Sequence, residues 1–517
     1  MIKEIRVKNY KAFKDATIPI KPITVFLGAN SAGKSSIIQL LLLLQQTAEA
    51  SESYRSALKI SGRKINIGKC ENLFFNKDTS NPISIELFYD KDILISHIES
   101  VYENVFGTFG LISIGKNSRL SKMWKNFDTL SDDFRNEIQK KLKKVPDGWV
   151  FLCRPRHIDA TQKAEVAELL TSFYEIKKYS QNYDIKIHFT ISFNQNNSLG
   201  VSKFSIGIAD KSILTFDYAN KKVYSDSINL SESKLDNIYN CFSKETTSLF
   251  TICMYDRSTN HNLSITEESL VNLTSQILTW IRKDFTEPKI NHISPLRAHP
   301  QRYYMLDKAD LKISLDTLDA NAIAEVLKDN PTLKKKVNLW FKKYDIEIDP
   351  EELIESIHRL SVSQLGMSLD ITDVGFGISQ VLPVVLQGFM SPEKSVTLIE
   401  QPEIHLHPKM QAELADLFID ILKERQNAKK SLIVETHSEY LLRRLRRRMA
   451  EGKIKTTDVS INLFHGRTKD TPAKIENLPI ESKGAFEWPE EFYGDELYKD
   501  ITEFLKLQSN VDIHTND

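Results

Sequence analysis

Apolar and polar positions form regular patterns near both ends of the chain, and these patterns predict one sheet built from two distant segments. Near the N-terminus, Ile23–Leu27 is almost wholly apolar, as expected of a strand buried on both faces. The helix predicted after it is apolar on most sides and should therefore be covered on several sides. The elements predicted in this stretch are strands at 2–9, 17–27 and Ile83–Tyr89, a turn at Tyr10–Ala16 and a helix at Ser35–Thr47.

From residue 289 onward, short apolar runs alternate with segments of helical periodicity. Asn330 and Pro331 are a favourable helix start, because Asn caps free backbone N–H groups and Pro is tolerated in the first turn. Strands are predicted at Met367–Asp373, Ser395–Glu400, Ser431–Glu435 and Val459–Phe464, and helices at Pro331–Tyr344, Ile378–Gln387, Pro408–Arg425 and Glu439–Glu451. This alternation predicts an α/β fold with parallel central strands.

The middle of the chain is less regular. A helix at Ala160–Lys178 and strands at Ile185–Phe193 and Val201–Ile208 are predicted, and no heptad register is sustained long enough for a coiled-coil arm. We therefore expect an inserted α+β subdomain. The predicted domains are an N-terminal lobe at 1–95, the insert at 96–288, a C-terminal lobe at 289–470 and a short tail domain at 471–517.

Composition limits the classes of function. Lys+Arg and Asp+Glu both number 69, so contact with nucleic acid would have to come from local patches or from a partner. The longest apolar run, Ile37–Leu44, is broken by Gln39 and is far too short to span a membrane. The four cysteines form no CxxC pair, and the chain begins directly in a strand pattern with no signal peptide. We expect a reduced cytoplasmic protein with no membrane segment.

A complete GxxxxGK[ST] motif follows the buried strand and opens the helix, which is the context that a phosphate-binding loop needs. Its backbone N–H groups would cradle phosphate oxygens, and the helix N-terminus adds a favourable dipole. Lys34 would reach the β- and γ-phosphates of ATP, and Ser35 would bind Mg²⁺. The predicted nucleotide-binding residues are Gly28, Ala29, Asn30, Ser31, Ala32, Gly33, Lys34, Ser35 and Ser36.

Two further strand ends carry candidate catalytic groups. Glu400 ends the apolar strand at Ser395–Glu400, where it would bind Mg²⁺, and Glu403 would polarise the attacking water as general base. His437 follows the strand at Ser431–Glu435 and would contact the γ-phosphate from the same sheet edge. Each residue alone has a plainer structural interpretation, and the combination with the phosphate loop favours catalysis.

A glycine-containing turn before the helix at Ile378–Gln387 supplies free backbone N–H groups at a helix start. The turn begins at Gly375. We expect it to bind the γ-phosphate of a nucleotide held by a second subunit, through Gly377, Ser379 and Gln380. A plain strand–helix turn is the alternative.

These four elements, in this order, resemble the ABC-type ATPase superfamily, in the cytosolic branch of the chromosome-maintenance (SMC), RecF and OLD-type heads. The segments VKNYKAF, FLGANSAGKSS, DVGFGISQVLP, IEQPEIHLHP and ETHS are similar to AAA family ATPases of bacterial antiphage defence operons, such as the Septu ATPases, including retron-associated forms, and the PARIS ATPases. The resemblance covers 1–90 and 289–500. Residues 484–495 are similar to a short domain of unknown function that ends some of these proteins.

The resemblance implies an ABC-type ATPase head of the P-loop class that uses ATP and Mg²⁺ and forms a head-to-tail dimer or a higher even-numbered oligomer. The chain departs from the family pattern in three places. The Walker B acid is Glu400 rather than Asp, no Ser precedes Gly375, and no glutamine loop can be placed. The tail after Phe464 is too short for the Toprim nuclease domain of OLD proteins and carries no HNH-like cluster.

Two weaker signals leave alternatives open. His405 and His407 resemble half a metal site, but zinc takes three or four protein ligands. The arginines of Arg443–Arg448 either complement the helix dipole and are solvated, or form a surface for DNA or a protein.

Three functional hypotheses follow from the sequence. The first is an ATP-gated switch that controls a separately encoded effector in antiphage defence, which we expect to be a nuclease of the HNH or Toprim type. The second is a DNA-repair or DNA-end-binding ATPase of the RecF/SMC kind, with nucleic acid as its ligand. The third is an autonomous nuclease whose metal site lies within 96–288.

Overall fold

The computed structural model describes residues 1–50, 55–108, 131–143, 148–151, 155–194, 197–242, 248–251, 263–286, 288–297, 301–305, 320–354, 357–423, 429–469, 471–488 and 502–508. The chain forms two compact units. The first contains Met1–Lys11 and Leu43–Phe285, and the second contains Ala12–Leu42 and Thr286–Asp517. Within the described ranges, no helix combines the length and apolar character needed to cross a membrane.

The first unit is built on an antiparallel sheet with strand order β10-β9-β8-β7-β4-β1. Alternate residues of β4, Ile83, Ile85, Leu87 and Tyr89, are buried, as its pattern predicts. Its strands are β1 (Ile2–Tyr10), β4 (Ile83–Tyr89), β7 (Ile185–Phe193), β8 (Leu199–Ile208), β9 (Lys211–Asp217) and β10 (Lys222–Tyr224).

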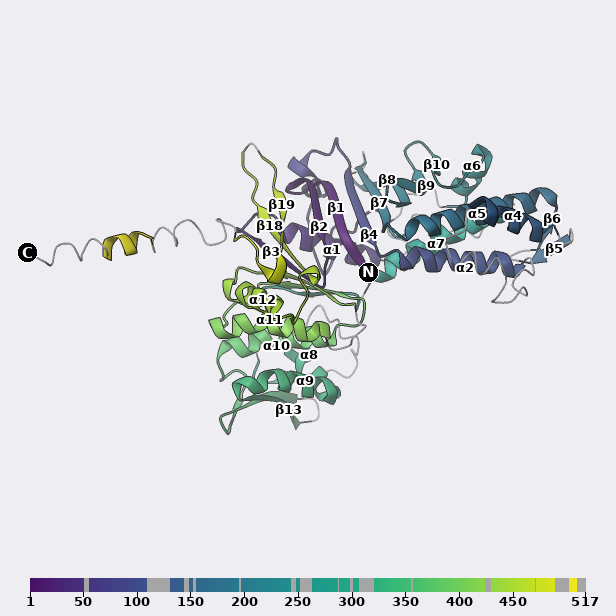
Figure 1. The fold of residues 1–517 in the computed structure, drawn as a ribbon. Helices are drawn as coiled ribbons and strands as arrows, with labels where there is room; N and C mark the ends of the chain where they lie inside the picture. The colour runs from purple at the N-terminus through teal and green to yellow at the C-terminus, as the bar shows by residue number, and fades with distance from the viewer. Residues whose placement is uncertain are drawn as a thin grey trace, which may run out of the picture. The chain divides into compact units, whose positions relative to one another are not determined.

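Helices of the same unit pack beside one another (Figure 1), and Trp280 of α7 meets Tyr89 of the sheet edge to face, with ring centroids 4.8 Å apart. The helices are α2 (Asp92–Thr108), α4 (Ser131–Leu142), α5 (Ala160–Ser180), α6 (Glu232–Asn240) and α7 (Ile265–Phe285), and β5 (Gly148–Phe151) and β6 (Pro155–Ile158) form a hairpin. The predictions for α5, β7 and β8 are confirmed to within two residues. The helical insert contains no helix longer than 21 residues among those described.

The second unit contains a six-stranded sheet with strand order β11-β16-β17-β3-β18-β19. The first five strands are parallel, and β19 is antiparallel to β18. The strand β3 comes from the N-terminal segment and lies between β17 and β18, so both ends of the chain build this sheet, as predicted. The strands are β3 (Ile23–Gly28), β11 (Ile290–Ile293), β16 (Val396–Glu400), β17 (Ser431–Glu435), β18 (Val459–His465) and β19 (Lys474–Leu478).

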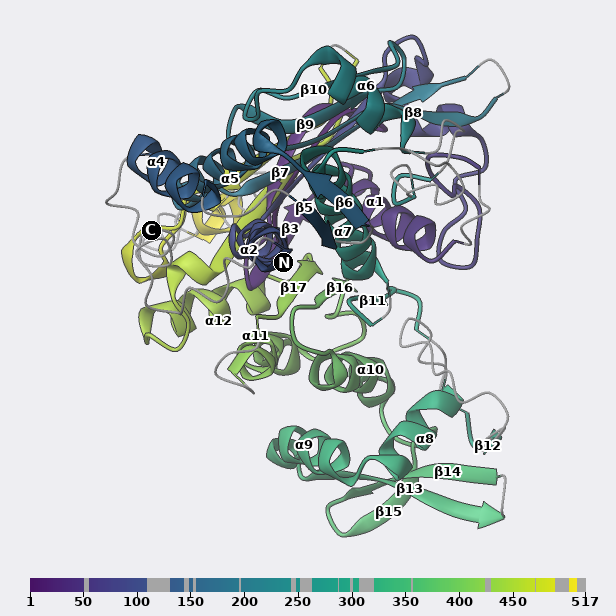
Figure 2. The ribbon, with the colours of Figure 1, turned by 90° about the vertical axis from the view of Figure 1, so that its right-hand side faces the viewer.

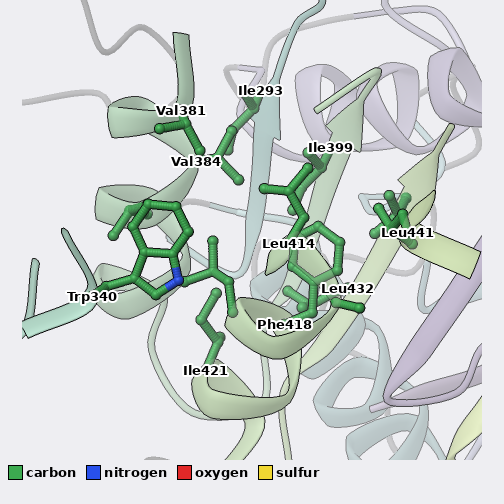
Figure 3. Packing of buried hydrophobic residues seen from close by; sticks show 14 of the residues in the cluster. Ile293, Trp340, Val381, Val384, Ile399, Leu414, Phe418, Ile421, Leu432 and Leu441 are labelled. Carbon is green, nitrogen blue, oxygen red and sulfur yellow. The ribbon is translucent and has the colours of Figure 1, made fainter. Parts of the chain in front are cut away.

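Three helices cover one face of this sheet, α10 (Phe376–Met390), α11 (Pro408–Lys423) and α12 (Glu439–Ala450). Figure 3 shows their apolar side chains packed against strand residues such as Ile399 and Leu432. The approach of α10 to α11 requires a glycine, because a Cβ at Gly388 would lie 2.2 Å from Cδ1 of Ile421. Burial of this cluster holds the strand ends in place.

A second, smaller sheet in this unit was not predicted. It consists of β12 (Tyr304–Met305), β13 (Ile346–Ile354), β14 (Ile357–Gln364) and β15 (Met367–Asp370), and it groups with α8 (Ala320–Asp329) and α9 (Pro331–Phe341) (Figure 2). The helix start predicted at Asn330 is confirmed, because its Oδ1 accepts a hydrogen bond from the Leu333 N–H at 3.0 Å.

The prediction of a single strand at 17–27 was wrong. The chain forms β2 (Phe13–Pro19) and β3 instead, and β2 begins inside the segment predicted as a turn. Pro22 lies in the gap and has no N–H to donate to a sheet. The strand predicted at Met367–Asp373 is also shorter, since β15 ends at Asp370.

Candidate nucleotide-binding site

The phosphate loop connects β3 to α1 (Lys34–Ala48), as the motif predicts. Two of its glycines have positive φ, 135° at Gly28 and 105° at Gly33. A Cβ at Gly28 would lie 2.4 Å from the carbonyl oxygen of Phe464, and one at Gly33 would lie 2.7 Å from the ring of Phe13. Glycine is therefore required at both positions by the backbone conformation and by the neighbouring atoms. Ala29, Asn30 and Ser31 are exposed along the loop, Ala32 is buried, Ser35 is exposed at the start of α1, and Ser36 is half-buried.

Lys34 is buried and folds back over the loop. Its Nζ donates hydrogen bonds to the carbonyl oxygens of Gly28 and Ala29, both at 2.9 Å. It also lies 3.7 Å from Oε1 of Glu435 at the end of β17. Burial lowers the pKa of Lys34, whereas the charges of Glu435 and Glu403 act in the opposite direction. An incoming phosphate would compete for an ammonium group that already has three oxygen neighbours.

Glu403 is held in a defined orientation by donors from the segment after β17. The Thr436 hydroxyl donates to its Oε2 at 2.8 Å, and the His437 backbone N–H donates to its Oε1 at 2.6 Å. Burial raises the pKa of Glu403, and these hydrogen bonds oppose that effect. A carboxylate with a raised pKa accepts a proton more readily, which suits the predicted general base.

Glu400 ends β16 directly opposite Glu435 of the neighbouring parallel strand. Its Oε1 lies 2.7 Å from Nε2 of His292 on β11. The predicted Mg²⁺ donors Ser35 and Glu400 are both oxygen ligands, which is the donor type that Mg²⁺ prefers, so the residues present fit this ion.

Arg297 joins several parts of the site. Its guanidinium donates at 3.1 Å to the backbone carbonyls of Glu400 and Gln401 and, from the other side, to that of Gln380 in α10. Burial lowers the pKa of Arg297 to about 10, so the side chain still carries its charge at neutral pH. It therefore connects the first turns of α10 with the end of β16.

The predicted signature turn lies where expected, at the start of α10. Gly375 is the N-cap residue, and as a glycine it has no side chain with which to cap the helix. Ser379 and Gln380 are buried in the turn that follows. A Cβ at Gly377 would lie 3.1 Å from the His405 carbonyl oxygen, so this turn packs against the loop that follows Glu403 in the same chain. Its predicted contact with a nucleotide of a second subunit stays a prediction.

His437 is exposed at the sheet edge beyond β17, and partial desolvation and the Lys34 charge lower its pKa. It is therefore neutral at pH 7. The role of His437 at the γ-phosphate stays a prediction, as do the roles assigned to the other site residues. What the structure places at one sheet edge is the loop after β3, the end of β16 and the end of β17.

Sequence reasoning missed three residues of this edge: His292, Arg297 and the carboxylate of Glu435. Glu435 is the glutamate of the ETHS segment and lies at the end of a predicted strand, and this position could have marked it as a site residue. No comparable pattern marks His292 or Arg297. Both lie in a segment whose spatial neighbours can be identified only once the order of strands in the sheet is known.

The arginines of α12 are engaged within the chain. Arg444 and Arg448 pair with Asp416 of α11, and Arg447 and Arg448 also pair with Glu451. The remaining two contact other groups: Arg443 pairs with Glu439, and Arg446 lies over the rings of Phe486 and Trp488 in the tail segment. Of the predicted tail domain, the structure describes 471–488 and 502–508, and the other residues lie outside the described ranges.

Across the part of the chain that the structure describes, no three His, Cys, Asp or Glu side chains gather into a metal-binding group. His407 Nδ1 instead accepts a hydrogen bond from the Lys409 N–H at 3.3 Å.

Comparison with known proteins adds a family and several looser likenesses. A sequence profile described as "AAA ATPase domain" matches residues 1–442. A stretch of 91 residues is 29% identical to the OLD nuclease of Thermus scotoductus, and the match covers 17% of this chain and only 15% of that relative's length.

Among solved structures, an SMC head bound to the C-winged helix domain of ScpA is 10% identical, with a TM-score of 0.40, covering 93% of this chain and 98% of the other. The SMC head domain from Thermotoga maritima is 9% identical, with a TM-score of 0.35, covering 93% and 99%.

Proposed function

The chain belongs to the AAA ATPase domain family, and on that premise we propose that it binds and hydrolyses ATP with Mg²⁺ and works as a switch that controls a separately encoded effector in antiphage defence. The observation that carries the ATPase part is the convergence of Lys34, Glu400 and Glu403 at one edge of a parallel sheet, on elements from both ends of the chain.

In the proposed reaction, the phosphate loop holds the triphosphate and Lys34 leaves its carbonyl partners to bind the phosphates. Ser35 and Glu400 would hold Mg²⁺, and the ion would supply positive charge to offset the negative charge that develops during phosphoryl transfer. Glu403, oriented by Thr436 and the His437 N–H, takes a proton from the attacking water. Arg297 fixes the backbone of Glu400 and Gln401, and so maintains the position of the strand end.

The switch part of the proposal requires ATP to favour one assembly state. A nucleotide shifts such an equilibrium only through its different affinity for the two states. The turn of α10 supplies a mechanism, because Arg297 joins the Gln380 carbonyl to the end of β16. A nucleotide bound at the sheet edge would thereby change the position of the turn that is predicted to contact the nucleotide of a second subunit.

The first experiment measures ATP hydrolysis and oligomeric state of the purified chain, with Lys34→Ala and Glu403→Gln as the two variants. We expect Mg²⁺-dependent hydrolysis by the native chain, no nucleotide binding by Lys34→Ala, and an ATP-bound dimer for Glu403→Gln. Hydrolysis by Glu403→Gln at the native rate would contradict the role of Glu403 as the base.

The effector part is tested by pull-down of tagged Glu403→Gln from its native host with ATP, followed by mass spectrometry. A stoichiometric nuclease or toxin that is absent with Lys34→Ala supports the switch hypothesis. Recovery of DNA and repair proteins alone contradicts it and favours the RecF/SMC-like alternative.

A further inference from the structure

Glu435 carries a buried carboxylate that the reaction above does not use. The residue is 5% exposed, and its Oε1 lies 3.7 Å from Nζ of Lys34. Its Oε2 is buried and has no hydrogen-bond partner among the described residues. An unsatisfied buried carboxylate oxygen is costly, and such a group in a site with catalytic geometry calls for a functional explanation.

The charges around Glu435 are unbalanced. Glu400 stands opposite it on the neighbouring strand. Burial raises the pKa of Glu435, the Lys34 charge opposes that effect, and the charges of Glu400 and Glu403 add to it. Three carboxylates thus face two basic side chains, Lys34 and Arg297, at this edge. A triphosphate adds several negative charges to a site where the acidic side chains already outnumber the basic ones by one.

Lys34 is the group for which the carboxylate and the phosphates compete. It is the phosphate-binding cation of the loop, and Glu435 is the acidic side chain nearest to its Nζ. A nucleotide that arrives without a metal ion must draw Lys34 away from Glu435 and then lie beside an uncompensated carboxylate. A nucleotide that arrives with Mg²⁺ brings two positive charges, which offset that repulsion.

We propose that Glu435 determines which form of the nucleotide this site accepts, by making binding conditional on the divalent cation. The carboxylate disfavours metal-free ATP and ADP and tolerates their Mg²⁺ complexes. This inference rests on the proposed nucleotide binding. It goes beyond it by assigning the metal requirement to a residue outside the predicted Mg²⁺ ligands Ser35 and Glu400.

The test is equilibrium binding of ATP and of ADP by calorimetry, each in excess Mg²⁺ and in EDTA. We compare the native chain with Glu435→Gln, which keeps the shape and removes the charge, and Glu435→Asp, which keeps the charge. Glu351→Gln is the matched control, because it removes one carboxylate from the separate four-stranded sheet, where Glu351 pairs with Arg359.

For the native chain, Glu435→Asp and Glu351→Gln, we expect affinity for both nucleotides to fall by about tenfold or more in EDTA, the size of one close like-charge interaction. For Glu435→Gln, we expect affinity in EDTA to come within about threefold of that in Mg²⁺. Affinity in excess Mg²⁺ should change little in any variant. Thermal unfolding checks that each variant is folded.

Two outcomes overturn the inference while leaving the proposed function intact. One is an unchanged metal dependence in Glu435→Gln. The other is a loss of affinity in Glu435→Gln that appears only with Mg²⁺, which would make Glu435 a ligand of the ion. Failure of the native chain to bind Mg²⁺-ATP at all would instead contradict the proposed function.

Discussion

The second unit contains two clusters of charged side chains with opposite character: the carboxyl edge of the six-stranded sheet and the exposed end of α12. At the sheet edge, Lys34 and Glu435 are buried, Nζ of Lys34 lies 3.7 Å from Oε1 of Glu435, and Oε2 of Glu435 has no hydrogen-bond partner among the residues that the structure describes. At the end of α12, Arg448 pairs with Asp416 of α11 and lies 2.6 Å from Oε2 of Glu451, and Arg447 lies 2.7 Å from Oε1 of Glu451. Charges that satisfy one another stabilise the fold, whereas charges left in imbalance are available for a ligand.

Replacing Lys34 with Ala should have the largest effect, because it leaves the buried carboxylate of Glu435 without its cation. We expect a loss of about 3 kcal/mol in the free energy of unfolding, together with loss of nucleotide binding. Denaturant unfolding and calorimetry measure the two effects. The double variant Lys34→Ala/Glu435→Gln should recover most of the stability and none of the binding. Equal stability of the single and double variants would contradict the view that Lys34 offsets the buried charge of Glu435.

Replacing Glu403 with Gln should reduce hydrolysis by about 100-fold or more, because an amide cannot accept the proton from water. Binding should persist, since the amide oxygen can accept from the His437 N–H while the Thr436 hydroxyl accepts from the amide nitrogen. Single-turnover hydrolysis and ATP affinity are the measurements. A parallel loss of affinity would show that the substitution disturbs the loop rather than the chemistry.

Replacing Asp416 with Asn should lower the free energy of unfolding by about 1–2 kcal/mol, because Arg444 and Arg448 both lose a charged acceptor. The Arg448 and Asp416 side chains are 13% and 21% exposed, so solvent compensates only partly. Hydrolysis of ATP should be unchanged. A fall in hydrolysis with stability unchanged would place the helix in the catalytic cycle and remove the contrast.

The raised pKa of Glu403 predicts a smaller effect, in which a substitution increases the free energy of unfolding instead of lowering it. A carboxyl group whose pKa is higher in the folded state than its usual 4.5 favours folding at low pH, and that contribution is lost as pH rises through the folded pKa. Glu403→Gln never carries the buried charge. It should therefore exceed the native chain in unfolding free energy at pH 8, with the difference shrinking toward pH 4.5. Unfolding curves across this range measure it.

Local sequence specified the phosphate loop and the strands that end at Glu400 and Glu435, because a buried strand followed by a glycine turn and a helix has a distinctive short-range pattern. Arg297 could not be found in this way. Its three acceptors belong to Gln380, Glu400 and Gln401, which become its neighbours only when β11 pairs with β16.

The four-stranded sheet escaped prediction for a different reason. Its longest strand, β13, contains Pro350 and a run of acidic residues, which are rare inside strands. Its edge is protected by a side chain instead: Asn338 of α9 accepts from the Ile348 N–H at 2.9 Å and donates to the Ile348 carbonyl at 3.0 Å. A side chain of a helix thus forms the hydrogen bonds that a neighbouring strand would otherwise form. No pattern within β13 itself reveals that this helix covers its edge.

The smallest effect is expected at the most exposed arginines of α12. Arg443 and Arg447 are both 66% exposed and pair with Glu439 and Glu451 one helical turn away. Such exposed pairs contribute about 0.3–0.5 kcal/mol each, so replacing both arginines with Gln should lower the unfolding free energy by less than about 1 kcal/mol.

The same double variant tests the DNA interpretation of this helix. A chain that used these two arginines for phosphate contacts would lose affinity for duplex DNA, and the dependence of that affinity on salt would become shallower by about two phosphate contacts. Because both arginines already have carboxylate partners in the chain, we expect affinity and salt dependence to be unchanged. Fluorescence anisotropy with a labelled duplex at several salt concentrations measures both quantities. A shallower salt dependence would mean that DNA displaces these partners, and the charges of α12 would then belong with those of the sheet edge.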